Sequence, residues 1–189
     1  WRAIPVDWVF DHGQDLSRPG FQRELHEGLL EVDFIAAALD CSTKSRAREI
    51  PRVFADGRPM PQPLRSHQHP MGLPGLKGRD LQRVATDNEA AEYVLAEIQL
   101  LHDRGGASVR ENPANSLHWD TPTEVRMLES GAWHDKFYAA CVLQGARNKR
   151  QRLRHDVEEI QHWPEMDCHH MHQKNEWCPW EGKDGSTVF

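Results

Sequence analysis

Apolar positions in the first quarter of the chain alternate between runs of strand length and helical spacing. Residues 3–9 form a short strand-like stretch, and residues 32–39 form a continuous apolar run. A continuous run of this length is typical of a parallel strand that is covered on both faces. Between these stretches, residues 19–30 place large apolar side chains at helical spacing. The order strand, helix, strand predicts one right-handed crossover unit.

The rest of the chain continues this alternation. Residues 79–103 form the longest predicted helix, with one apolar face along its length. Residues 107–110 predict a strand, residues 121–130 a helix, and residues 137–143 and 152–157 a late pair of strands. This order predicts an α/β fold built on an open, Rossmann-like sheet with helices on both faces. Ligands of such sheets bind at the carboxyl ends of the strands.

Two stretches do not fit this alternation. Residues 51–78 are dense in Pro, Gly, His and Arg, and a loop of this length is usually functional or disordered. Residues 161–189 are rich in Cys, His and Trp. We therefore predict an α/β domain over residues 1–160, followed by a tail over 161–189 that is packed on the domain or partly disordered.

The composition narrows the classes of function. The 189 residues carry a net charge of -6, so the chain has no global basic signature for nucleic acid. Its basic residues are nevertheless grouped, at 44–52 and at 147–154. Four irregularly spaced cysteines favour reduced thiols in a nuclear or cytoplasmic protein. No run approaches the roughly 20 apolar residues of a membrane span, so no membrane partner is expected.

Cys41 is the candidate nucleophile, because it follows the predicted strand 32–39 almost directly. A thiolate is the reactive form of cysteine, and nearby cations lower the pKa of the thiol. The cations available here are Lys44, Arg46 and Arg48, and the neighbouring hydroxyls are Ser42, Thr43 and Ser45. The alternative is that Cys41 is a small buried side chain without chemistry.

Glu111 and two arginines are the other candidate catalytic residues. Glu111 follows the predicted strand 107–110, where partial desolvation would let its carboxyl hold a proton near neutral pH. Arg150 and Arg152 point the same way by the two-residue period of a strand and suit a phosphate or a base oxygen. The alternatives are a turn-capping glutamate and a charged hairpin. Asp7, Cys41 and Glu111 all end predicted strands at one rim.

Taken in order, these residues resemble the motifs of the DNA cytosine-5 methyltransferases, in particular a divergent, phage-like or mobile-element-associated branch. Cys41 and Ser45 match the family's Pro-Cys-Gln-x-Phe-Ser loop, although Asp40, Ser42 and Lys44 depart from it. Residues 111–113, Glu-Asn-Pro, match its Glu-Asn-Val, and residues 148–152 match its Gln-x-Arg-x-Arg strand. Asp7 matches the acid that binds the cofactor ribose, and the pair Asp15 and Leu16 matches residues near the adenine.

The resemblance implies a class I methyltransferase sheet that binds S-adenosylmethionine and acts on DNA. A flipped cytosine would receive the Cys41 thiolate at C6 and a proton from Glu111 at N3. Arg150 or Arg152 would hold the base oxygen or a phosphate, and C5 would then take the methyl group. The long loop over residues 51–78 would lie over DNA through Arg58, Arg65, His67 and His69. The family's Phe-x-Gly-x-Gly loop is missing, so we expect a fragment that is incomplete at both ends and impaired in activity.

Two alternatives to this enzyme remain open. One is a methyltransferase-like module of a mobile element that has lost catalysis and only binds nucleic acid. The other is a small zinc-binding structural protein built around the tail. The weak candidate ligands for zinc are Cys168, His172 and Cys178, completed by His169 or His170.

Overall fold

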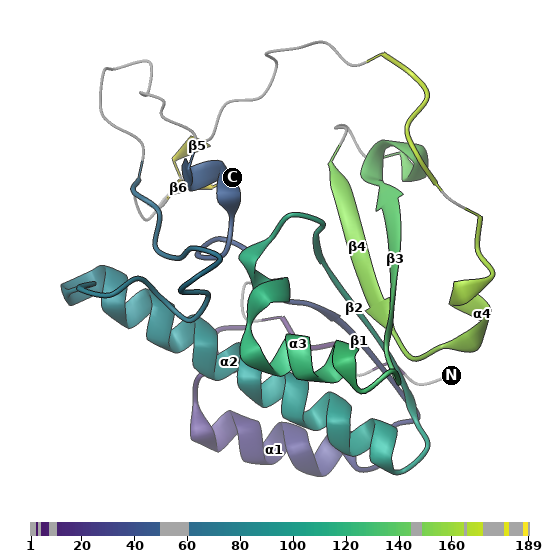
Figure 1. Cartoon of the computed structure of the whole chain (residues 1–189). Helices are drawn as coiled ribbons and strands as arrows, with labels where there is room; N and C mark the ends of the chain where they lie inside the picture. Colours follow the sequence, from purple (N-terminus) through teal and green to yellow (C-terminus); the bar gives the residue numbers. More distant parts are fainter. Residues whose placement is uncertain are drawn as a thin grey trace.

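Four strands form one mixed sheet in the computed structural model of this chain (Figure 1). Their spatial order is β1 (Phe34–Ala38), β2 (Ala107–Pro113), β4 (Arg150–His155) and β3 (His134–Ala139). β1 and β2 are parallel, whereas β4 runs antiparallel to both of its neighbours, β2 and β3. The carboxyl ends of β1, β2 and β3 therefore lie at the same edge of the sheet as the start of β4.

The structure describes residues 3, 5–7, 11–49, 61–144, 149–164, 166–171, 180–181 and 187–188. Within these residues the chain is α/β, as the sequence predicts. The four main strands appear in the predicted order along the chain, with the late pair formed by β3 and β4.

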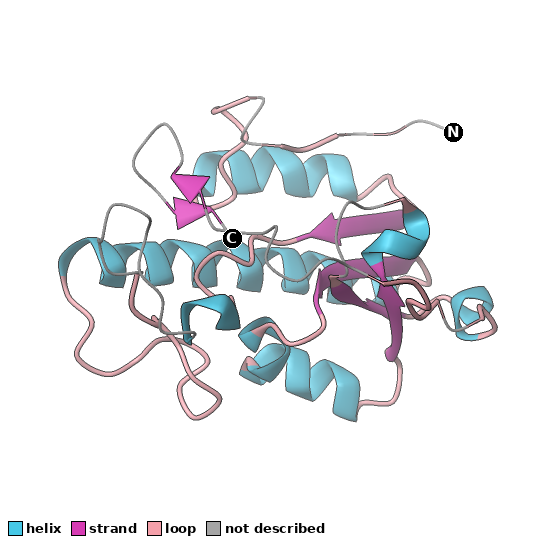
Figure 2. Cartoon of the chain, turned by 90° about the horizontal axis from the view of Figure 1, so that it is seen from above, coloured by secondary structure: helices cyan, strands magenta, loops and turns pink. Residues whose placement is uncertain are grey.

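Three longer helices accompany the sheet: α1 (Pro19–Leu29), α2 (Gly78–Asp103) and α3 (Pro122–Glu129). α2 lies between α1 and α3 in both ribbon views (Figures 1 and 2). The shorter elements are η1 (Arg46–Glu49), η2 (Leu117–Asp120), η3 (Ala140–Leu143), α4 (Glu158–Gln161) and the two-residue strands β5 (Trp180–Glu181) and β6 (Thr187–Val188).

The hydrophobic core lies on the face of the sheet that α2 and α3 cover. Leu95 and Ile98 of α2 pack there against Met127 of α3 and Trp133, and all four are at most 5% exposed. Ile35 and Ala37 of β1 complete this cluster from the sheet. Burial of these apolar side chains is the main force that holds the helices on the sheet.

β1 is covered less completely than its sequence predicts. Its residues alternate between half-buried and exposed, and Phe34 is 44% exposed. Only the face that carries Ile35 and Ala37 packs on the core. The expectation of a strand buried on both faces is therefore wrong. The opposite face of the sheet carries the short helix α4, where Lys136 donates a hydrogen bond to the backbone of Gln161.

Three of the predicted strands differ from the observed structure. Residues 3 and 5–7 of the predicted first strand are not in a strand, and the rest of that prediction lies outside the described residues. β2 continues through Glu111 to Pro113, so the Glu-Asn-Pro motif is the end of the strand itself. Residues 140–143 form η3 instead of extending β3, and Gln144, with a φ of 67°, ends that turn in the left-handed region.

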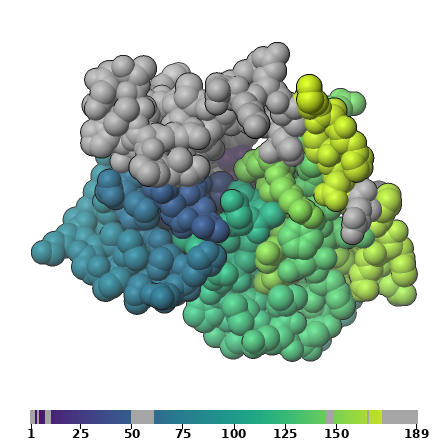
Figure 3. All heavy atoms as spheres, turned by 45° about the horizontal axis from the view of Figure 1, so that its top comes forward, coloured from purple at the N-terminus to yellow at the C-terminus, as the bar shows by residue number. Residues whose placement is uncertain are grey.

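The segment 166–171 returns to the sheet beside β3. Met166 forms a parallel bridge with Tyr138, and its carbonyl oxygen accepts a hydrogen bond of 2.8 Å from the backbone of Ala139. Figure 3 shows this segment, in yellow, on the surface beside the green strands. The part of the predicted tail around Met166 is therefore held against β3.

Candidate functional site

Cys41 and Glu111 meet at the carboxyl ends of the two parallel strands. Ala38, the last residue of β1, pairs in register with Glu111 of β2, and Cys41 follows three residues later. The two side chains are close enough for the charge of Glu111 to raise the pKa of the Cys41 thiol. The structure thus places both residues at one edge of the sheet, as their positions after two parallel strands predict.

The environment of Cys41 differs from the predicted one, because the pKa of its thiol is raised. Burial is the largest cause, and the charges of Asp40 and Glu111 add to it. The cation that lowers this pKa is Lys149, which is exposed at the start of β4. The prediction that Lys44, Arg46 and Arg48 activate the thiol is therefore wrong.

Those three cations have other partners. Lys44 is fully buried, with its Nζ 2.5 Å from Oδ1 of Asp87. Arg46 pairs with Glu49 at 2.9 Å, and Arg48 donates to the carbonyl oxygen of Ser42 at 2.9 Å. The basic cluster of this loop is therefore part of the scaffold that shapes the turn around Cys41.

The hydroxyls beside Cys41 are also structural. Asp40 accepts hydrogen bonds of 2.8 Å from both the backbone and the hydroxyl of Ser42, a local turn that acidic residues commonly form. The Thr43 hydroxyl donates to Asp87, and the Ser45 hydroxyl accepts from the backbone of Ala47 at 3.2 Å. These contacts fix the backbone on both sides of the sulfur.

The pKa of Glu111 is shifted in the direction that the sequence predicts. Burial raises the pKa of its carboxyl, and the charge of Lys149 partly opposes this. Its Oε1 atom is buried and has no hydrogen-bond partner among the described residues. Tyr138 lies on the same face of the sheet, and its own pKa is raised by burial and by the charge of Glu111. A half-buried carboxyl with a free oxygen is thus the centre of this site.

Asn112 ties the loop that carries Cys41 to β2. Its side-chain amide donates 2.8 Å to the carbonyl oxygen of Leu39, two residues before the sulfur. A second connection joins the following turns, where the backbone of Leu117 donates 3.0 Å to the carbonyl oxygen of Lys44. Asn112, next to Glu111 in β2, therefore positions the loop that carries Cys41.

Arg150 and Arg152 point to the same side of β4, as predicted, and both guanidinium groups lie over the ring of Phe137. The strand register places this side opposite to Glu111, because Arg152 pairs with Asn112 and Glu111 pairs with Leu153. Arg152 also donates 3.3 Å to the carbonyl oxygen of Ala114. The structure thus does not bring the arginines to the side of the sheet that carries Glu111.

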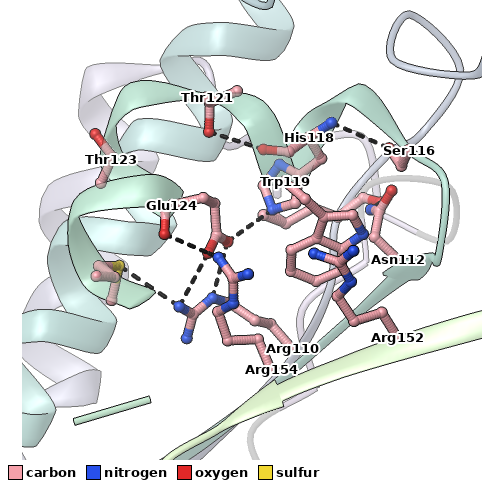
Figure 4. Close-up of polar contacts among 12 residues, drawn as sticks. Arg110, Asn112, Ser116, His118, Trp119, Thr121, Thr123, Glu124, Arg152 and Arg154 are labelled. Carbon is pink, nitrogen blue, oxygen red and sulfur yellow. Dashed lines mark hydrogen bonds and ion pairs between the residues drawn. The ribbon is translucent and has the colours of Figure 1, made fainter. Parts of the chain in front are cut away.

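A buried ionic network stands on that opposite face (Figure 4). The Glu124 carboxylate of α3 accepts from Arg110 Nε at 2.8 Å and from Arg154 at 2.8 Å, and all three residues are at most 1% exposed. His118 Nε2 lies 2.9 Å from the same carboxylate. Burial alone would raise the pKa of Glu124, but the His118 hydrogen bond and the Arg110 charge outweigh it and hold this pKa below its usual range.

A second buried network encloses Asp87 of α2. Arg65 donates 3.0 Å to Asp87 and 2.6 Å to Asn88, and Arg65 is 1% exposed. The prediction that Arg65 faces DNA is therefore wrong. His67 and His69 are exposed, with His67 Nδ1 2.6 Å from Asp120, and Arg58 lies outside the described residues.

Of the residues predicted to bind the cofactor, Leu16 lies in a cavity beside the outer edge of β1. A cavity of about 930 Å³ is lined by Val6, Leu16 and the strand itself, and this volume suits a small-molecule site. Asp15 does not offer its Oδ1 atom freely, because that oxygen accepts from the backbone and hydroxyl of Ser17. Asp7 is exposed, and its backbone donates 2.7 Å to Gln14. Neither Asp7 nor Asp15 is among the described residues that line this cavity.

Of the weak metal candidates, Cys168 is described, whereas His172 and Cys178 lie outside the described residues. None of the three described cysteines is in a disulfide. The candidate site gains two residues that sequence reasoning missed as participants, Lys149 and Asn112. Asn112 lies in the Glu-Asn-Pro stretch and Lys149 in the basic group 147–154, but neither pattern predicts these particular roles.

Comparisons with models of protein families, with curated proteins and with solved structures found no match for this chain. Among the helices that the structure describes, none combines the length and the apolar character that crossing a membrane requires.

Proposed function

We propose that this site methylates C5 of cytosine in DNA, with S-adenosylmethionine as the methyl donor and a covalent adduct on Cys41. One observation carries the proposal: a thiol and a carboxyl with a raised pKa lie together at the ends of two parallel strands. Covalent catalysis on a pyrimidine needs both a nucleophile and a proton donor in one site.

The charges of the site fit such a reaction. Cys41 and Glu111 repel each other when both are ionised, so the pair favours a single negative charge. The reactive state places that charge on sulfur and a proton on the carboxyl. Lys149 stabilises the negative charge in either position, since it lowers the pKa of both groups.

The reaction would proceed on a cytosine that is flipped out of the duplex, because its ring is otherwise inaccessible. The Cys41 thiolate bonds to C6 while Glu111 donates its proton to N3, which leaves C5 electron-rich. After C5 is methylated it loses its proton to a base, and the C6–S bond breaks to release Cys41. Asn112 would act as a positioning residue that holds the sulfur over the carboxyl.

The cofactor and DNA would bind at two different places on the chain. S-adenosylmethionine supplies the methyl group, and Val6 and Leu16 would hold its adenine in the cavity beside β1. Lys149 and Arg150 are exposed at the same edge of the sheet as Cys41, where they would attract the phosphate backbone. Arg150 and Arg152 would then act on a phosphate, because the register places them on the face opposite to Glu111.

A covalent trap tests this proposal. The whole chain is incubated with S-adenosylmethionine and a duplex that contains 5-fluorocytosine, whose fluorine prevents release of the enzyme. We expect an adduct that survives a denaturing gel, is abolished by Cys41→Ser and is slowed by Glu111→Gln. Folded protein that binds S-adenosylmethionine and the duplex without forming any adduct would contradict the proposal.

A second candidate is the catalytically inactive module that binds nucleic acid. The raised pKa of Cys41 favours it, because a thiol that stays protonated is a poor nucleophile. In the same experiment this candidate predicts retention of the duplex with no adduct, and equal retention by Cys41→Ser.

A further inference from the structure

Two thiols and an imidazole lie close together beside the end of β3, and they are different residues from those of the Cys41 and Glu111 site. Cys141 lies in η3, and Cys168 and His170 lie in the segment that returns along β3. One ligand atom from each residue lies within 4.8 Å of the others. Cys141 and Cys168 are half-buried and His170 is exposed, so the cluster opens to solvent on one side.

We propose that Cys141, Cys168 and His170 bind a zinc ion. Thiolate and imidazole are the ligands that zinc prefers, in tetrahedral geometry with Zn–S of about 2.3 Å and Zn–N of about 2.0 Å. This geometry separates the ligand atoms by roughly 3.5–3.8 Å. Cys168 Sγ lies 3.6 Å from His170 Nδ1, so this pair already has the spacing that zinc imposes. The open side leaves the fourth position to water.

The backbone positions these ligands without help from a metal. The bridge between Tyr138 and Met166 fixes the returning segment, and Cys168 follows two residues later. On the other side, the backbone of Ala140 donates 2.9 Å to the carbonyl oxygen of Lys149, which fixes η3 against the start of β4. The ion would therefore fasten the returning segment to the connection that carries Lys149.

This site differs from the zinc site that the tail sequence suggests. The tail spacing points to Cys168, His172 and Cys178, whereas the structure brings Cys168 close to Cys141, which lies 27 positions earlier, just after β3. Such a long-range pair has no short sequence motif. The proposal is independent of methyl transfer.

Metal titration of the whole reduced chain tests the site. We expect one equivalent of Zn²⁺ per chain, and Co²⁺ should give tetrahedral visible bands with a thiolate-to-cobalt charge-transfer band. Cys141→Ser and Cys168→Ser should each weaken that band, and His170→Gln should lower Zn²⁺ affinity at least tenfold. His169→Gln, at the neighbouring exposed position, and Cys41→Ser should leave metal binding unchanged.

Circular dichroism of each variant separates loss of a ligand from loss of the fold. If a variant unfolds, the Co²⁺ spectrum of the unmodified chain still tests whether thiolates bind the metal. Folded, reduced protein that takes up no stoichiometric Zn²⁺ would overturn the proposal. Equal effects of His169→Gln and His170→Gln would overturn it too, and so would a Cys141–Cys168 disulfide that persists in reductant.

Discussion

Arg110 and Glu111 are neighbours in β2, yet they face opposite sides of the sheet and opposite electrostatic surroundings. Arg110 is 1% exposed and donates from Nε and from a terminal nitrogen to the Glu124 carboxylate. Glu111 is half-buried, its Oε1 atom has no hydrogen-bond partner in the described part of the chain, and burial raises its pKa. Among the described residues, one face of the sheet therefore carries Arg110 in an ion pair, and the other carries a glutamate whose Oε1 atom accepts no hydrogen bond.

The difference between the two faces separates structural charge from candidate functional charge. A buried carboxylate that is paired and hydrogen-bonded keeps a low pKa and stabilises the fold around it, as Glu124 does. A carboxyl that is desolvated without a partner does not stabilise the fold. Groups of this kind concentrate at functional sites. Replacing each glutamate in turn tests this distinction directly.

The largest expected effect is that of Glu124→Gln. The substitution leaves Arg110 buried without the counter-charge of Glu124, while Arg154 keeps only its ion pair with Asp135. Breaking a buried ion pair in this way should cost about 3–5 kcal/mol of unfolding free energy. Urea denaturation at neutral pH measures this loss. Glu129→Gln, at an exposed position of the same helix, should stay within about 0.5 kcal/mol of the parent chain. Equal stability of the two variants would show that the network contributes nothing.

Asn112→Ala should have an intermediate effect. It removes the hydrogen bond to Leu39 and leaves a carbonyl oxygen unpaired, at a cost of about 1–3 kcal/mol. It should also loosen the turn that carries Cys41, so alkylation of this thiol should become faster at fixed pH. Asn115→Ala, at an exposed position three residues on, is the matched control. An unchanged rate of Cys41 alkylation in a folded Asn112→Ala chain would show that Asn112 does not position the sulfur.

Glu111→Gln should have the smallest effect on stability, no more than about 1 kcal/mol and in the stabilising direction at neutral pH. The folded-state pKa of Glu111 lies above its ordinary value of 4.5. The unfolded chain therefore ionises first as the pH rises, and the parent chain loses stability relative to the variant from about pH 4.5 upward. Urea denaturation of both chains at pH 4 and pH 7.5 measures this. A loss of unfolding free energy comparable to that of Glu124→Gln would contradict the distinction between the two faces.

The sequence predicts the elements better than it predicts their charges. Hydrophobic periodicity identifies α1, α2 and α3 and places four strands in order, because each signal lies within one local segment. It misassigns residues 140–143, whose apolar run of Ala, Cys, Val and Leu is equally compatible with a strand and with the turn observed.

The partners of the basic residues are invisible in the sequence because they are distant along it. Lys44 and Asp87 lie 43 positions apart, and only the packing of the loop on α2 joins them. Sequence reasoning therefore assigns Lys44 to the thiol and Arg65 to DNA, although both neutralise Asp87. The pairing of Cys41 with Glu111 is predictable because parallel strands bring their carboxyl ends together at one edge.

The most direct test of the account measures the pH dependence of Cys41 alkylation, followed on its own peptide by mass spectrometry. Glu111→Gln should shift the titration of this thiol to lower pH, because a charge that raises its pKa is removed. Lys149→Gln should shift it to higher pH, and Glu129→Gln should leave it in place. Coincident curves for all four chains would contradict the claim that Cys41 and Glu111 share one site.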